Sequence, residues 1–234
     1  MIMTWILLSS LFLGGGECPL TRPDIEGPYW LPGSPERSNL REEGDVPLLD
    51  LSGVVLGNDC VPIPGAWIDI WHADPEGDYD KGGWGYRGHF YADSEAGYLL
   101  ETVVPGLYPG RTSHIHVKVQ GNTNDVFTTQ LYFPDLPEND SDFFYHPDLE
   151  VTVESEDSDG NMVATFVFVL DEPGTVPCPG DLDEDGEINV NDVLILLGAW
   201  PGAGGDVDGD GDTDVNDLLA MLAVYGQSCG SAAH

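Results

Sequence analysis

The sequence contains very few basic residues. Lys and Arg together number 7 against 42 Asp and Glu, which gives a formal net charge of −35. This shortage argues against nucleic acid as a partner, because phosphate contacts need clustered Lys and Arg. It argues against adsorption to anionic membranes for the same reason. We instead expect some of the carboxylates to bind cations.

The sequence also lacks an apolar run long enough to span a bilayer. Residues 2–13 are mostly apolar and are followed by three glycines. This length is typical of the hydrophobic part of a secretory signal peptide, although no positive charge precedes it. We predict a signal peptide over residues 1–17, with a buried N-terminal segment as the alternative, and no membrane span elsewhere.

Only four cysteines are present, and none forms a Cys-x-x-Cys motif. Thiolate zinc sites and thioredoxin-like redox sites therefore have no support. In an exported protein, four cysteines indicate disulfide bonds. Three pairings are possible, of which we favour Cys18–Cys60 with Cys178–Cys229; free buried cysteines are the alternative.

Glycine and proline are abundant, at 30 and 18 residues, without a collagen-like period, which favours a turn-rich β protein. Residues from about 45 to 170 contain segments rich in Val, Ile, Thr, Tyr and Phe between Gly, Pro, Asn and Asp clusters. We predict a mostly β protein with an antiparallel β-sandwich domain, or a barrel, over residues 18–170, followed by a linker over 171–177. The strands that we expect are 66–72, 98–104, 113–119, 126–133 and 162–170.

An internal repeat follows the linker. Residues 181–192 and 206–217 share a pattern of oxygen-bearing side chains at a constant offset of 25 residues, from 181 to 206. Ca²⁺ needs six to eight oxygen ligands on a tightly turned loop, and each copy has glycine at its sixth position. We predict two Ca²⁺ sites rather than a solvated acidic face. The first would use Asp181, Asp183, Asp185, Asn189, Asp192 and the carbonyl of Glu187; the second Asp206, Asp208, Asp210, Asp214, Asp217 and the carbonyl of Asp212.

In each copy of the calcium repeat we expect a helix to follow the loop, and we expect the two helices to share an apolar face. These faces comprise Val193, Leu194, Leu196 and Leu197, and Leu218, Leu219, Met221 and Leu222. The duplicated loop and helix resemble a dockerin domain over residues 178–230, although the last loop position is Asp instead of the usual Glu. The resemblance implies a small α-helical domain that binds a cohesin module of another protein. Together with the signal peptide, it implies a secreted, cell-surface or periplasmic bacterial protein.

The strand at residues 113–119 carries a His-x-His motif. Because side chains alternate along a strand, His114 and His116 share one face, while Ile115, Val117 and Val119 share the other. Two imidazoles at this spacing can bind one metal ion. Taken alone, the motif is weak evidence for a metal site and favours a pair of surface histidines.

Several motifs in order surround this strand. They are residues 25–29 (IEGPY), 62–72 (PIPGAWIDIWH), 71–79 (WHADPEGDY), 105–112 (PGLYPGRT) and 128–133 (TTQLYF). Together with the histidine strand they resemble the intradiol ring-cleavage dioxygenases over roughly residues 20–170.

The resemblance implies a mononuclear non-haem Fe(III) bound by Tyr79, Tyr108, His114 and His116. Phenols have a pKa near 10, so only a strongly polarising cation keeps two of them ionised at neutral pH. Hard anionic oxygen ligands also suit ferric iron. Without the resemblance, each tyrosine would be interpreted as a half-buried aromatic of a strand or turn. His72, His89 and His146 receive no ligand role.

The resemblance also implies an activity, in which a catechol-type aromatic and O₂ give a muconate-type diacid that contains both oxygen atoms. Tyr108 would be displaced by the substrate and take one of its protons. Arg111 would stabilise charge developing on the ring, and Gln130 would lie near the substrate; a structural ion pair and a sheet-edge hydrogen bond are the alternatives. Gly110 stands where protocatechuate enzymes of the family have a large aromatic, which leaves the particular catechol open.

Two competing interpretations remain. The chain could be a non-catalytic secreted β-sandwich that binds carbohydrate or protein, assembled through the dockerin. Alternatively, the metal could support another reaction, such as extradiol cleavage or oxidation to a quinone.

Overall fold

The computed structural model describes residues 18–123, 125–174, 178–183 and 185–227. The expected signal peptide and Cys229 of the second expected disulfide bond lie outside these residues. In the described part of the chain, no helix combines the length and the apolar character needed to cross a membrane.

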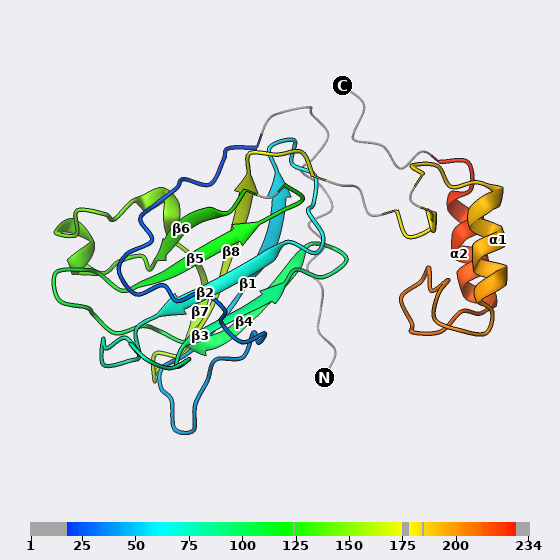
Figure 1. Ribbon diagram of the computed structural model, residues 1–234. Coiled ribbons are helices and arrows are strands. Elements are labelled where there is room, and N and C mark those ends of the chain that lie inside the picture. Colours follow the sequence, from blue (N-terminus) through cyan, green and yellow to red (C-terminus); the bar gives the residue numbers. More distant parts are fainter. Residues whose placement is uncertain (1–17, 124, 175–177, 184, 228–234) are drawn as a thin grey trace.

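Residues 48–170 form two four-stranded sheets, which confirms the mostly β fold (Figure 1). One sheet has the order β4-β1-β8-β7 and the other the order β3-β2-β5-β6. Two short 3₁₀ helices, Pro137–Asp140 and Pro147–Leu149, follow β6. The strands are β1 Leu48–Gly57, β2 Trp67–His72, β3 Arg87–Tyr91, β4 Gly97–Val103, β5 His114–Gln120, β6 Phe127–Tyr132, β7 Thr152–Glu156 and β8 Met162–Leu170.

The hydrophobic core lies between the two sheets and fixes the orientation of β5. Ile115, Val117 and Val119 of this strand are fully buried in the core. His114 and His116 consequently face the outer side of the β3-β2-β5-β6 sheet, as the alternation predicts. Burial of one side of the strand therefore determines where the histidines lie.

One strand pair differs from the predicted antiparallel sandwich. β1 and β8 pair in parallel, from Leu49 opposite Met162 to Gly57 opposite Leu170, so the prediction of a wholly antiparallel sandwich is wrong here. The remaining described strand pairs are antiparallel. Parallel pairing needs a long crossover connection. Here the other strands of the domain supply it, because β1 is its first strand and β8 its last.

Three strands, β1, β3 and β7, were not predicted individually. β7 has the sequence TVESE and is mostly exposed at the edge of its sheet. β3 is only five residues long and contains a glycine. Such segments lack the apolar alternation on which strand prediction depends.

Residues 18–40, the N-terminal segment, cover the outer face of the sheet that carries the histidines (Figure 1, dark blue). The amide of Asp24 donates to the carbonyl of Thr128 in β6 at 3.1 Å. Trp30 Nε1 and Ser34 Oγ donate to the two carboxylate oxygens of Asp69 in β2, at 2.9 and 2.7 Å. These contacts hold the N-terminal segment against β2 and β6.

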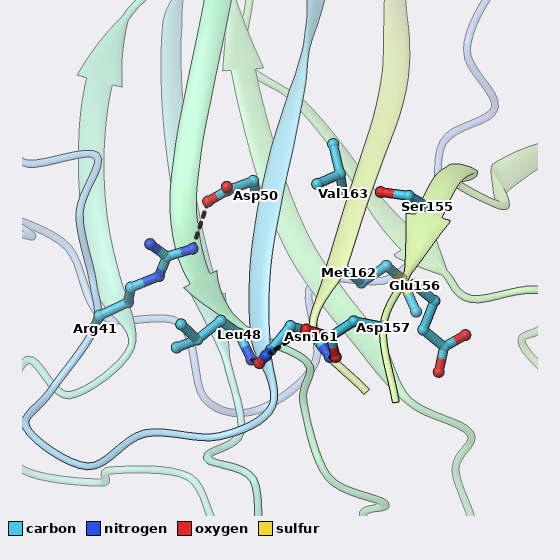
Figure 2. Close-up of a pocket in the computed structure, with 9 residues that line it drawn as sticks. All are labelled: Arg41, Leu48, Asp50, Ser155, Glu156, Asp157, Asn161, Met162 and Val163. Carbon is cyan, nitrogen blue, oxygen red and sulfur yellow. Dashed lines mark hydrogen bonds and ion pairs between the residues drawn. The ribbon is translucent and has the colours of Figure 1, made fainter. Parts of the chain in front are cut away.

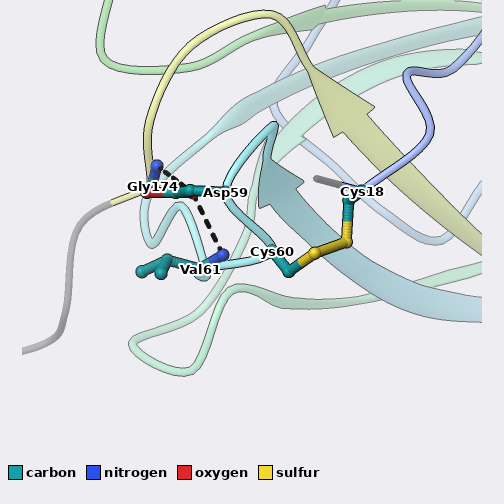
Figure 3. The surroundings of a disulfide bond; sticks show 5 residues. All are labelled: Cys18, Asp59, Cys60, Val61 and Gly174. Atoms are coloured by element: carbon teal, nitrogen blue, oxygen red, sulfur yellow. Dashed lines mark hydrogen bonds between the residues drawn. A yellow bond between two sulfur atoms is a disulfide. The ribbon is translucent and has the colours of Figure 1, made fainter. Parts of the chain in front are cut away.

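A disulfide bond between Cys18 and Cys60 fixes the start of the N-terminal segment, which confirms the first predicted pairing (Figure 3). Beside it, Asp59 Oδ1 accepts hydrogen bonds from the amides of Val61 and Gly174, at 3.1 and 3.0 Å. The segment after β8 is therefore held beside the Cys18–Cys60 disulfide bond. Residues 171–174, expected at the start of the linker, pack on the sandwich, and the carboxylate of Glu172 accepts from two backbone amides.

The C-terminal repeat folds as two helices, α1 Val190–Ala199 and α2 Val215–Val224. Each begins with a capping box, formed by Asn189 and Asp192 in α1 and by the equivalent pair in α2. A small core of Ile188, Leu196, Val207 and Met221 joins the helices. The expected apolar faces are only partly correct, because of their eight residues only Leu196 and Met221 are fully buried.

Candidate metal centre and catalytic site

The two histidines of β5 form the base of the candidate site. His114 and His116 are 4% and 2% exposed, and their ring centroids lie 4.9 Å apart. Nδ1 of His114 donates to the carbonyl of Thr112 at 2.6 Å. Because a carbonyl only accepts, this bond places the proton on Nδ1 and leaves a lone pair on Nε2. Trp71 of β2 stacks on His116 with a centroid distance of 4.9 Å.

Two tyrosines from separate loops meet these histidines. Tyr79 follows β2 and is 7% exposed, and its hydroxyl lies 3.1 Å from Nε2 of His114. Tyr108 lies between β4 and β5, and its ring centroid is 5.8 Å from that of Tyr79. The two loops touch at Gly106, where a Cβ would lie 2.3 Å from the carbonyl oxygen of Pro75. The structure thus brings the four predicted iron ligands together from three segments.

Tyr29 is a member of this cluster to which the sequence analysis gave no role. Its hydroxyl forms a 2.9 Å hydrogen bond with the hydroxyl of Tyr108, and its ring stacks on Tyr79 with centroids 4.4 Å apart. The sequence motif at residues 25–29 contains Tyr29, but nothing in its spacing indicates that this tyrosine lies at the site.

Burial sets the protonation of the cluster. Desolvation lowers the pKa of His114 to about 4 and places that of His116 well below its usual value. Both imidazoles are therefore neutral at neutral pH, which is the form that binds metals. Burial also raises the pKa of Tyr79. A cation is needed before the Tyr79 phenol ionises. Among the residues that the structure describes, none forms a hydrogen bond with the buried Nδ1 of His116. Neutral imidazoles beside phenols fit a ferric ion as donors.

Arg111 lies beside the cluster of two tyrosines and two histidines, and its guanidinium is fixed by hydrogen bonds to Asp142 and Gln130. Its Nε donates to both carboxylate oxygens of Asp142, at 3.0 and 2.8 Å, and its Nη2 donates to Oε1 of Gln130 at 2.8 Å. Burial by itself would raise the pKa of Asp142, but hydrogen bonds from Phe144, Thr112 and Arg111 lower it overall. The carboxylate therefore stays ionised and orients the guanidinium.

Gln130 is fully buried in β6, and both ends of its amide are occupied. Oε1 accepts from Arg111, and Nε2 donates to the carbonyl of Ile25 at 2.9 Å. Gln130 pairs with His116 across the sheet, and its predicted place near the substrate stays a prediction. Its contacts connect the arginine to the N-terminal segment.

His72 is buried away from the ligand cluster. Nδ1 lies 2.7 Å from the carbonyl of Ala73, and Nε2 lies 2.8 Å from Oγ1 of Thr102. Desolvation lowers the pKa of His72 to about 4. Both ring nitrogens are occupied by protein groups.

Two cavities border the cluster. One of about 310 Å³ contains Tyr108, Gly110, Arg111 and Glu138 in its lining, and no atom would lie within 4 Å of a Cβ at Gly110. The other, of about 250 Å³, includes Tyr29 and Lys81. A further groove of about 300 Å³ lies on the other sheet, around Arg41 and Asp50, and contains none of the predicted site residues (Figure 2).

The two acidic loops each gather carboxylates. Ligand atoms of Asp181, Asp183 and Asp185 lie within 4.8 Å of one another, and so do those of Asp206, Asp208 and Asp210. The aspartate at the last position of the first loop also accepts hydrogen bonds from the backbone. Asp192 is fully buried, and its carboxylate accepts from the amides of Leu182, Asp183 and Asn189.

The chain is similar to known dioxygenases. A protein-family model described as "Dioxygenase" matches residues 25–173. The chain is 29% identical over 184 residues to a chlorocatechol 1,2-dioxygenase of Pseudomonas sp. strain P51, covering 64% of this chain and 70% of that protein. It is 30% identical over 149 residues to a catechol 1,2-dioxygenase of Pseudomonas sp. strain EST1001, covering 52% and 49%.

Solved structures of dioxygenases share the fold of this chain. The dioxygenase domain of a dioxygenase and carbohydrate-binding protein fusion from Streptomyces sp. SirexAA-E superposes with a TM-score of 0.63 and 43% identity, covering 66% of this chain and 99% of that one. The 3-chlorocatechol 1,2-dioxygenase of Rhodococcus opacus 1CP, at 24% identity and a TM-score of 0.60, shares the fold over 65% of this chain and 72% of its own.

Proposed function

The chain belongs to the intradiol ring-cleaving dioxygenases, and from this premise we propose that it opens the ring of a catechol-type aromatic with O₂ to give a muconate-type diacid. The observation that carries the proposal is the meeting of Tyr79, Tyr108, His114 and His116 beside Arg111. Enzymes of this family use non-haem Fe(III).

We assign the ferric ion to these two tyrosines and two histidines. The neutral imidazoles and the phenols, which ionise only beside a cation, fit a hard trivalent ion. Bound iron supplies Lewis-acid polarisation of a chelated catecholate. His114 reaches the site in a fixed orientation, because its Nδ1 is bonded to the carbonyl of Thr112.

The remaining residues bind, orient and exchange protons. As a phenolate, Tyr108 would accept a proton from a substrate hydroxyl on its Oη and become a phenol, and the hydroxyl of Tyr29, 2.9 Å away, would hold that oxygen by a hydrogen bond. Arg111 stabilises negative charge that develops on the ring, because Asp142 and Gln130 fix its guanidinium beforehand. Gln130 acts as a positioning residue for Arg111.

The experiment is an optical spectrum of the iron-loaded full-length chain, followed by mass spectrometry of the product. Tyrosinate bound to Fe(III) should give a burgundy charge-transfer band. We expect Tyr108→Phe and Tyr79→Phe to weaken it, whereas Tyr91→Phe, at a 54% exposed position of β3, should not. A colourless iron-loaded protein contradicts the iron assignment, and a semialdehyde product contradicts intradiol cleavage.

We also propose that residues 178–230 form a dockerin-like domain with two Ca²⁺ sites. Support comes from the two carboxylate clusters and from the repetition of the loop and helix. Repulsion from neighbouring aspartates contributes to the raised pKa of Asp183 and Asp208, after the effect of desolvation. A divalent cation would relieve this repulsion.

A calcium titration of the full-length chain tests the domain. We expect two binding events by calorimetry, and the loss of one in Asp183→Asn and of the other in Asp208→Asn. Asp159→Asn is the control, because Asp159 is an exposed acidic residue of the sandwich. Absence of calcium binding in the unmodified chain would overturn the assignment.

A cohesin module is the partner that we propose for this domain. Four leucines at equivalent positions of the two helices, Leu194, Leu197, Leu219 and Leu222, are 50% to 62% exposed. Exposed apolar side chains repeated on both helices are typical of a protein-binding surface. Together with the signal peptide proposed for residues 1–17, the cohesin partner implies a secreted, cell-surface or periplasmic bacterial enzyme that is attached to another protein.

A further inference from the structure

Tyr132 is a buried residue at the end of β6 that is not among the predicted site residues. It is fully buried and pairs with His114 across the sheet. Because side chains alternate along a strand, it shares the outer face of the sheet with Gln130, two residues before it. Among the described residues, its hydroxyl lies within hydrogen-bond distance of none of the four predicted iron ligands. It reaches Asp24, Arg111, Gln130 and Phe144, so any effect of Tyr132 on the site passes through these neighbours.

The hydroxyl of Tyr132 accepts a hydrogen bond from Arg111. A phenol has one proton to donate and lone pairs with which to accept. Two groups that only accept lie close to it, Oδ2 of Asp24 at 2.8 Å and the carbonyl oxygen of Phe144 at 2.9 Å. Nη2 of Arg111, which can only donate, lies 3.3 Å away. Whichever acceptor takes the phenolic proton, the oxygen therefore presents its lone pairs to the guanidinium.

Asp24 places a second carboxylate behind this hydroxyl. Its Oδ1 accepts from the amide of Ile25 at 2.6 Å, and its own amide donates to the carbonyl of Thr128 at 3.1 Å. The side chain and the backbone of Asp24 are thus both fixed beside β6. A hydrogen bond to a carboxylate is stronger than one between neutral groups, and it increases the negative charge on the phenolic oxygen that accepts from Arg111.

Two of the three guanidinium nitrogens of Arg111 are bonded to the protein. Nε donates to Asp142, and Nη2 donates to Gln130 and Tyr132. None of the residues that the structure describes accepts from Nη1. Because the guanidinium is planar, fixing Nε and Nη2 also fixes the direction of the two Nη1 protons.

Nη1 is consequently the nitrogen of Arg111 that is available to a ligand. Arg111 and Tyr108 both line the cavity of about 310 Å³. The ring of Phe144 covers one face of the guanidinium, with Cζ of Arg111 4.9 Å from the ring centroid. Hydrogen bonds therefore hold the guanidinium within its plane, and an aromatic ring holds it perpendicular to that plane.

We propose that Tyr132, supported by Asp24, is a positioning residue that orients Arg111 so that Nη1 donates towards the negative charge that develops on the substrate. The inference rests on the proposed ring cleavage. A donor stabilises developing charge most when it is oriented before the reaction begins. Without the hydroxyl of Tyr132, Nη2 keeps Gln130 as its single acceptor, and the guanidinium is held less firmly.

Kinetics of the iron-loaded full-length chain with catechol compare Tyr132→Phe with Tyr145→Phe. Both changes remove a phenolic hydroxyl that is bonded to a carboxylate, since Tyr145 donates to Oε1 of Glu150 at 2.6 Å. Of the two, Tyr132 alone contacts Arg111. We expect kcat to fall about fivefold in Tyr132→Phe, the effect of one net hydrogen bond, with KM unchanged. Tyr145→Phe should keep the kcat of the unmodified chain.

Two further variants distinguish positioning from a purely structural role. In a chain that carries Arg111→Gln, Tyr132→Phe should lower kcat no further, because the group that it orients is absent. A further loss in that background would overturn the proposal. Asp24→Asn keeps an acceptor for the hydroxyl but removes the charge, and should lower kcat about twofold. This half-buried position keeps the proposal testable if Tyr132→Phe does not fold, and an unchanged kcat there would count against it.

Chemical labelling separates this proposal from the proposed function. Phenylglyoxal modifies guanidinium groups, and mass spectrometry of the peptide that contains Arg111 measures the rate without turnover. The rate should be about threefold higher in Tyr132→Phe than in Tyr145→Phe, because Nη2 has lost an acceptor. Faster labelling in a chain that does not cleave catechol would support the positioning role and contradict the dioxygenase function alone. Equal labelling of Arg111 in the two variants, or equal kcat values, would overturn the positioning role.

Discussion

At the scale of single residues, the site depends on close approaches that leave no room for larger side chains. Gly27 has a φ of +70° and faces His116, where a Cβ would lie 3.0 Å from Cε1 of the imidazole. His114 is fixed by one backbone carbonyl. A larger side chain at such a contact would therefore displace the imidazole of His114 or His116.

Gly27→Ala should reduce iron retention. The new methyl group pushes against the His116 ring, and the positive φ costs on the order of 1 kcal/mol in addition. Metal analysis after dialysis measures the loss. Gly33→Ala is the control, because Gly33 has a φ of +83° but open space around its Cβ. Equal iron contents in the two variants would contradict the steric explanation.

The buried histidines should make the iron-free protein sensitive to acid. Burial lowers the pKa of His72 and His114 to about 4, whereas an unfolded histidine titrates near 6.5. The unfolded state therefore binds more protons between these values, and stability present above pH 6.5 is lost as the pH falls towards 4.

We expect the free energy of unfolding to decrease by about 2 kcal/mol per buried histidine between pH 7 and pH 5. Urea denaturation followed by tryptophan fluorescence measures this, because Trp71 is buried in the sandwich domain. A stability that is constant or rises towards pH 5 would show that these histidines are not buried in neutral form.

At the scale of elements, the helices of the repeat begin where their own aspartates cap them. Asp192 accepts from the amides of Leu182, Asp183 and Asn189, so one carboxylate joins the start of α1 to the loop before it. These hydrogen bonds give the carboxylate a structural role in addition to the cation binding proposed for it. It explains why an aspartate can serve at a loop position where glutamate is usual.

Asp192→Ala should destabilise the C-terminal repeat even in the presence of a chelator. The change removes hydrogen bonds to three backbone amides, each contributing about 1 kcal/mol. Thermal unfolding by circular dichroism with EDTA measures the effect. Asn191→Ala, at the exposed neighbouring position, should change little. Equal melting temperatures for the two variants would refute the capping role.

At the scale of the whole molecule, a covalent bond outside the candidate site supports it. The Cys18–Cys60 disulfide bond holds the N-terminal segment, which contributes Ile25, Gly27 and Tyr29 to the site. Loosening this segment affects both the stability of the fold and the metal centre.

Replacing both Cys18 and Cys60 by serine should lower stability by about 4 kcal/mol, the value expected for a closed loop with a sequence separation of 42. The melting temperature and the iron content should fall together, because the segment covers His116. If the double variant melts earlier but keeps its iron, the N-terminal segment does not support the site.

Much of the fold was predictable from local patterns. Enrichment in β-branched and aromatic residues between turn clusters identified five strands. Alternation identified the side of β5 that carries His114 and His116, since one face of a strand must enter the core. The parallel pairing of β1 with β8 was not predictable in the same way. Nothing within either segment specifies which distant strand lies beside it.

By itself the sequence determined that His114 and His116 share one face of β5 and that the acidic loop is duplicated, because alternation and repetition are local properties. Only the tertiary structure decided which distant groups join them. Tyr29 reaches Tyr108 across 79 residues, and Gln130 reaches Ile25 across 105. Such contacts depend on how separate loops pack, which is set by the burial of the whole core rather than by any segment alone.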